Sequence, residues 1–142
     1  MTSAQIFSIA NLTVVPAWLM LVFVPRSRWT RLAACYVVPS VLAMLYLTLL
    51  VMNKPPDGAG FGSIEQVERL FSDRWLLLAG WIHYLAFDLF VGAWEADDAA
   101  RIGLPHWYVV PCLALTFLVG PVGLLLYFAV RAAAGRLRAQ PA

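Results

Sequence analysis

The sequence predicts an all-α integral membrane protein, a four-helix bundle with a short amphipathic helix between its second and third spans. Of its 142 residues, 62% are hydrophobic and 13% are charged. Soluble domains hold about 45–50% apolar and about 25% charged residues. The apolar residues fall in four runs of the roughly 20 residues that a helix needs to cross a bilayer. Each run is far longer than the roughly ten residues of a barrel strand, which favours helices.

The four expected spans cover about residues 5–24, 32–52, 75–94 and 107–130. The first run has no Lys or Arg before it, so we expect a retained membrane helix and not a cleaved signal peptide. Tryptophans lie at the expected span ends, where aromatic belts form: Trp29, Trp75, Trp94 and Trp107. The Ala/Arg-rich tail, 131–142, is expected to fray. The whole chain, 1–142, then forms a single transmembrane domain.

A short helix is expected over about residues 63–72, inside the long connection between the second and third spans. Ser63 can cap its first turn, and Gln66 stands three residues later at the capping-box position. Its apolar side chains fall on one face: Ile64, Val67, Leu70 and Phe71. We therefore expect this helix to lie along the membrane surface.

The basic residues give a weak indication of orientation. Four spans would place both termini and the middle connection on one side of the membrane. That side would hold six Lys and Arg residues and the other side four. The positive-inside rule then favours cytoplasmic termini, in an inner membrane. The net charge is only +2, and no basic tract is interleaved with aromatics, so no nucleic-acid partner is expected.

Two ionisable residues lie well inside the third expected span, His83 and Asp88. A charge at that depth costs about 3 kcal/mol, so such residues usually mark function. Helical geometry separates the two by about 140° around the axis and ~7.5 Å along it, and both can border one interior pocket. For Asp88 we favour function. For His83 an interhelical hydrogen bond that only fixes packing is an equal alternative.

Polar groups in the other spans are expected at matching depths. Counting along antiparallel helices places Asn11 and Tyr46 level with His83, and Thr116 level with Asp88. The helix breakers at 120–123 fall in the same region. Irregular backbone at membrane depth is tolerated where it is packed in protein or lines a cavity. The sequence therefore predicts an off-centre polar pocket inside the bundle.

The third connection is acidic and ends in a histidine. Its candidate ligands for a divalent metal are Glu95, Asp97, Asp98 and His106. No recognised ligand spacing supports a metal site, so we favour a salt-bridged rim with Arg26, Arg28 and Arg31. Cys35 and Cys112 lie in apolar runs without a CxxC pattern, which disfavours a thiolate metal site or a disulfide. No cofactor is expected.

Several stretches of this chain together resemble the abscisic-acid-deficient-4-like family. The longest are residues 81–94 in the third span and 111–127 in the fourth. Further similar stretches are Asn11 with Trp18, residues 62–65 and residues 98–106. The likeness extends from about Phe7 to Tyr127 and indicates a compact bacterial relative of plant proteins associated with neoxanthin synthesis.

This resemblance implies an isomerase that acts on a carotenoid or another apolar isoprenoid. In plants the conversion opens a 5,6-epoxide of violaxanthin and forms an allene without gain or loss of atoms. Acid–base logic then assigns Asp88 as the acid and His83 as the base. The expected substrate-binding side chains are Asn11, Tyr84, Tyr46, Thr116, Trp81 and Phe87.

Two other function classes stay open at this point. A non-catalytic carotenoid- or lipid-binding or accessory protein would use His83 and Asp88 for packing or for gripping a ligand hydroxyl. A small proton-coupled transporter would use the intramembrane Asp88, although four short helices leave little room for alternating access without a homo-oligomer. The expected partners are the isoprenoid and membrane lipid.

Overall fold

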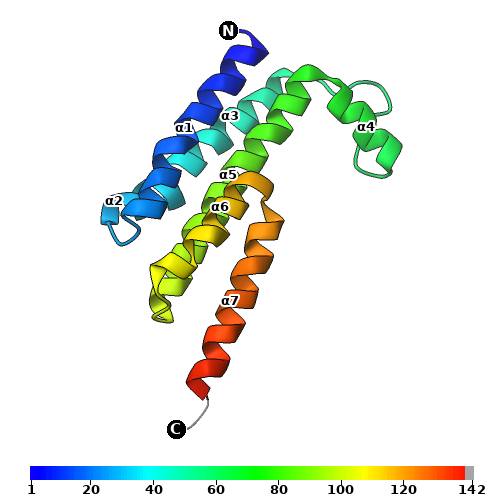
Figure 1. Cartoon of the computed structure of the whole chain (residues 1–142). Coiled ribbons are helices and arrows are strands. Elements are labelled where there is room, and N and C mark those ends of the chain that lie inside the picture. Colours follow the sequence, from blue (N-terminus) through cyan, green and yellow to red (C-terminus); the bar gives the residue numbers. More distant parts are fainter. Residues whose placement is uncertain (140–142) are drawn as a thin grey trace.

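The computed structural model describes the backbone of residues 1–139 and the side chains of residues 1–135. All regular secondary structure in this described part is helical, which confirms the all-α prediction (Figure 1). Three helices are long and apolar enough to cross a membrane: Ser3–Phe23, Arg28–Met52 and Arg74–Arg101. Their length and composition indicate that the protein is associated with a membrane.

The first two long helices agree with the predicted spans to within a few residues. Helix α1 (Ser3–Phe23) begins with a capping box formed by Thr2 and Gln5. The second long helix combines α2 (Arg28–Arg31), a π-helical stretch (Leu32–Val37) and α3 (Val38–Met52). The buried Thr30 hydroxyl donates to the Val24 carbonyl at 2.7 Å and closes the turn between α1 and α2.

The predicted short helix is present as α4 (Ile64–Ser72), and Ser63 Oγ accepts from the Gln66 backbone N–H at 3.4 Å. Helix α4 lies to one side of the long helices, near the start of α5 (Figure 1). Asp73 ends α4 and caps α5, because its carboxylate accepts from the backbone N–H groups of Trp75 and Leu76 at 2.9 and 3.0 Å. The position of α4 along a membrane surface stays a prediction.

The third predicted span is too short at its C-terminal end. Helix α5 (Arg74–Arg101) continues through the acidic segment that was expected to be a loop from residue 95. The reason is that Glu95 and Asp98 have partners on the last two helices, so their carboxylates need no aqueous loop. A helix also places them on the face that these helices cover.

The predicted fourth span, 107–130, is divided in the structure at the helix breakers around Gly120. A 3-10 turn (His106–Tyr108) leads into α6 (Val110–Val119), and α7 (Pro121–Ala139) follows. Gly120 between them has φ +50°, which a glycine adopts without strain, and Pro121 has no N–H to continue the helix. The chain folds back there: a Cβ on Gly123 would clash with backbone and side-chain atoms of Thr116.

This α6–α7 hairpin changes the topology of the bundle. The N-terminus and the described end of α7 lie at opposite ends of the molecule (Figure 1). Both termini were expected on one side of the membrane. This does not hold for the observed arrangement, because α6 starts and α7 ends at the same end of the bundle. The tail expected to fray from residue 131 is helical to Ala139, and residues 140–142 lie outside the described part.

Candidate functional site

The Asp88 carboxylate lies against the tip of the α6–α7 hairpin. A Cβ added to Gly120 would stand 3.0 and 3.2 Å from its two oxygens, which is tighter than an ordinary van der Waals contact. Oδ2 of Asp88 is buried and has no hydrogen-bond partner in the described part of the chain. Helix α7 begins at the next residue, and the positive end of its dipole favours a carboxylate nearby. A buried oxygen without a partner is costly, and such groups are uncommon in folded proteins.

Tyr84 lies one helical turn before Asp88 on α5, so both side chains fall on the same face. Its phenol interacts electrostatically with the Asp88 carboxylate. The Tyr84 ring also approaches the hairpin tip, since a Cβ on Gly120 would be 3.4 Å from Cε2. Tyr84 and Asp88 therefore form one polar pair at the point where the last helix breaks.

Tyr84, but not Asp88, is among the lining residues of an apolar groove of about 670 Å³. Aromatic rings follow one another along its wall: the ring centroids of Phe7 and Trp81 are 5.4 Å apart, and those of Trp81 and Tyr84 are 5.3 Å apart. The indole N–H of Trp81 donates to Asn11 Oδ1 at 3.3 Å. Three residues expected to bind substrate, Asn11, Trp81 and Tyr84, therefore gather at or beside this groove.

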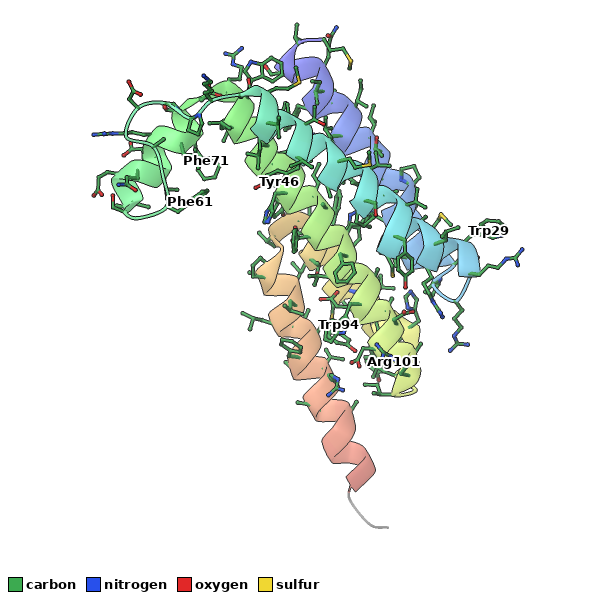
Figure 2. All side chains as sticks on the ribbon, turned by 180° about the vertical axis from the view of Figure 1, so that it is seen from behind. Trp29, Tyr46, Phe61, Phe71, Trp94 and Arg101 are labelled. Atoms are coloured by element: carbon green, nitrogen blue, oxygen red, sulfur yellow. The ribbon has the colours of Figure 1, made fainter. Side chains whose placement is uncertain are left out.

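His83 lies in a different place from Asp88. It lines a second pocket, of about 380 Å³, on the side of α5 that faces α3 and the connection after it. Its ring is 5.7 Å from the Tyr46 ring and 4.5 Å from the Phe87 ring, between centroids. The ring contact agrees with the prediction that Tyr46 and His83 lie at the same depth in the bundle. Tyr46 is labelled in Figure 2. The structure does not bring His83 and Asp88 to one cavity.

Thr116, expected level with Asp88, instead contacts Glu95. Its hydroxyl donates to the two Glu95 oxygens at 3.0 and 3.2 Å, and both residues are fully buried. The sequence prediction placed Glu95 in a loop and missed this contact. One signal in the sequence could have placed Glu95 on the helix with Asp88. The two residues are seven apart, and residues seven apart share a helix face.

The four candidate metal ligands have separate partners. Asp97 forms a salt bridge with Arg31 at 3.8 Å, which fits the expected rim between the two connections. The Tyr127 hydroxyl donates to Asp98 at 2.6 Å, and His106 Nε2 is 3.0 Å from the Val22 carbonyl. Among the described residues no three His, Cys, Asp or Glu side chains could hold a metal ion together.

Residues 5–127 match the family model described as ABA DEFICIENT 4-like. No curated protein and no solved structure matches the chain. The matched segment contains α5, the hairpin tip and the residues around Asp88 described above.

Proposed function

This chain belongs to the ABA DEFICIENT 4-like family, and from this membership we propose that it isomerises a carotenoid-like isoprenoid in the membrane by acid–base catalysis. One observation carries the proposal: an Asp88 oxygen without a partner lies beside Tyr84, and Tyr84 lines an apolar groove. A proton-transferring group next to an apolar binding surface is what such a reaction needs.

The groove suits a long hydrocarbon chain. Most of its lining is apolar, with Phe7, Phe71 and Trp81 supplying aromatic surface, while Ser3 and Arg74 add polar groups. Flat rings offer a conjugated chain a large contact area without polar groups that would lose their hydrogen bonds. The groove is open, so an isoprenoid can enter it from the bilayer.

The proposed reaction opens an epoxide and needs one acid and one base in turn. Asp88, in its protonated form, gives its proton to the epoxide oxygen while the carbon–oxygen bond breaks, and the Tyr84 hydroxyl holds that oxygen. The Asp88 carboxylate then takes a proton from the neighbouring chain carbon, and the electron pair of that C–H bond forms a new double bond. The substrate becomes an isomer, Asp88 regains its proton, and no cofactor takes part.

In this scheme His83 is not the base, because it lines the other pocket. Asp88 can serve both steps because its proton is returned by the substrate itself. In this scheme the Asp88 oxygen without a protein partner is the atom that transfers the proton, and Tyr84 connects Asp88 to the groove.

A pigment-binding protein without catalytic activity is the second candidate. The apolar character of the groove favours it, since binding alone needs only the aromatic wall. The two functions differ in the role of Asp88. A binder tolerates the loss of its proton chemistry, whereas an isomerase does not.

The test uses purified protein in lipid vesicles that contain violaxanthin. Since an isomer has the same mass as its substrate, products are separated by chromatography and then identified by mass and absorption spectrum. We expect Asp88→Asn to lower the rate of product formation by about 10²–10⁴-fold, the usual contribution of a general acid–base group. Tyr84→Phe should lower it less, because the variant loses only the hydroxyl that holds the oxygen.

Matched controls are Asp57→Asn and Tyr108→Phe, which change the same residue types outside the groove, and both should retain the wild-type rate. Bound but unaltered violaxanthin with wild-type protein would favour the binder. A full rate with Asp88→Asn would remove Asp88 from the chemistry.

A further inference from the structure

A polar cleft of about 120 Å³ lies between the turn that joins α1 to α2 and the C-terminal end of α5. Three of its lining residues have side chains that can carry positive charge: Arg26, Arg31 and His106. Its lining contains one acidic residue, Asp97. The groove of the proposed function is lined by residues near the starts of α1 and α5, so the two sites are separate.

Contacts on both sides hold the walls of this cleft in place. The buried Thr30 hydroxyl donates to the Val24 carbonyl at 2.7 Å and fixes the turn that carries Arg26. His106 Nε2 is 3.0 Å from the Val22 carbonyl, which joins the start of the hairpin to the end of α1. The basic side chains therefore stand on a backbone that is set before a ligand binds, which reduces the entropy lost on binding.

The positive charge of the cleft is only partly neutralised. Within the described part of the chain, the Arg26 guanidinium has no hydrogen-bond or ion-pair partner. Arg31 Nε and Asp97 Oδ2 are 3.8 Å apart, which is longer than a hydrogen bond. An adjoining hollow shares Arg31 and Asp97 and adds Arg101 to its lining. Three guanidinium groups thus lie near one carboxylate, and the excess of positive charge favours an anionic ligand.

The cleft lies where the long apolar helices end. Ser3–Phe23 and Arg74–Arg101 finish there, and Arg28–Met52 begins there. Two tryptophans in the segments that flank the cleft, Trp29 and Trp107, are 58% and 65% exposed. Figure 2 shows Trp29 at the outer edge of this end of the bundle. Exposed tryptophans at span ends mark the headgroup region of a bilayer, and basic pockets between transmembrane helices bind anionic headgroups there.

We propose that Arg26 and Arg31 bind the phosphate group of an anionic phospholipid in this cleft. A guanidinium binds phosphate oxygens through two parallel N–H donors, which suits a site with two arginines. The acyl chains would continue along exposed apolar side chains that follow Arg31 on the same helix, Leu32 and Tyr36. This apolar surface favours a lipid over free phosphate as the ligand.

The probes are phosphatidylglycerol and phosphatidylcholine, which share a phosphodiester and differ in net charge because choline is a cation. Each lipid is added to purified protein in detergent micelles, and native mass spectrometry measures the fraction of protein that retains it. We expect wild-type protein to bind phosphatidylglycerol about 25-fold more tightly, since each arginine near the surface contributes about fivefold. Arg26→Gln should reduce this preference to about fivefold, and the double variant Arg26→Gln/Arg31→Gln should abolish it.

Arg28→Gln is the matched control, because Arg28 lies at the same end of the bundle but outside the cleft, with its guanidinium 4.8 Å from the Trp29 ring centroid. This variant should keep the preference for phosphatidylglycerol. Equal losses with Arg28→Gln and Arg26→Gln would overturn the site, since any positive charge at this end would then attract the lipid. Asp97→Asn should strengthen phosphatidylglycerol binding, because it removes the carboxylate that competes with phosphate for Arg31.

Inorganic phosphate separates the two possible sources of the anion. Added at the same concentration as the lipid, it should leave phosphatidylglycerol bound, because it lacks the acyl chains. Displacement of the lipid by inorganic phosphate would assign the cleft to a free anion and overturn the lipid proposal. Equal affinity of wild-type protein for the two phospholipids would overturn it as well and would leave the groove proposal intact.

Discussion

The Thr116 hydroxyl donates to the Glu95 carboxylate at 3.0 Å, and neither side chain is exposed. This contact joins α6 to α5 in the part of the molecule where the hairpin enters the bundle. The protein supplies Glu95 with no other hydrogen-bond donor in the described part of the chain. The buried Glu95 carboxyl group, which lies between α5 and the hairpin, therefore has the Thr116 hydroxyl as its hydrogen-bond donor.

Thr116→Val should destabilise the protein, because valine keeps the shape of threonine but leaves Glu95 without a donor. The cost of an unsatisfied buried polar group is about 1–3 kcal/mol. The measurement is the free energy of unfolding in mixed micelles. Thr116→Ser retains the hydroxyl and should recover most of the loss. Equal stability of the valine and serine variants would show that Glu95 needs no partner there.

Two glycines of α7 should respond to alanine in opposite directions. A Cβ on Gly123 clashes with Thr116 and approaches the Cys112 carbonyl oxygen at 2.6 Å, so Gly123→Ala should cost at least about 2 kcal/mol. Gly135 has nothing within 4 Å of such a Cβ. Gly135→Ala should stabilise the helix by about 0.5–1 kcal/mol, because alanine loses less backbone entropy. Thermal unfolding in detergent measures both.

Much of the fold was predictable because apolar runs and capping residues are local signals. Helix α4 follows from Ser63 and its apolar face, and the first two long helices follow from their hydrophobic length. The hairpin was not predicted. A Gly-Pro pair can kink a helix or reverse the chain, and the difference depends on tertiary contacts, here those between Gly123 and Thr116.

The candidate site was predicted in part for the same reason. Tyr84 and Asp88 are one turn apart, so their common face follows from helical periodicity. His83 and Asp88 were expected to border one interior pocket, although they are about 140° apart around the helix axis. The structure instead has cavities on different sides of α5, and Gly120 rather than Thr116 lies at Asp88.

Tyr127 should stabilise the packing of α7 against α5 through its hydrogen bond to Asp98. The phenol is fully buried and its hydroxyl is 2.6 Å from the carboxylate, which also forms a salt bridge with Arg131 at 2.7 Å. A hydrogen bond to a charged group contributes about 1.5–3 kcal/mol, so Tyr127→Phe should lower the free energy of unfolding by that amount. Tyr108→Phe is the control, and an equal effect of both variants would contradict the assignment.

The hairpin also predicts the membrane topology. Three spans place the N-terminus and the described end of α7 on opposite sides, whereas four spans would place them together. Lys54, Arg69 and Arg74 lie between the end of α3 and the start of α5, and these two helix ends are at the end of the bundle where α1 begins (Figure 1). The other seven basic residues lie around α2, at the end of α5 or in α7, toward the opposite end: Arg26, Arg28, Arg31, Arg101, Arg131, Arg136 and Arg138. The positive-inside rule therefore favours a cytoplasmic C-terminal end.

Single cysteines test this topology in intact cells with a membrane-impermeant maleimide. The two positions are Asp57, in the connection before α4, and Gly135, on the exposed surface of α7, and each is replaced by cysteine. We expect the reagent to label Asp57→Cys directly and Gly135→Cys only after the membrane is permeabilised. Wild-type protein, whose Cys35 and Cys112 are in the helices, controls for background labelling. Labelling of both variants from the same side would contradict the three-span topology.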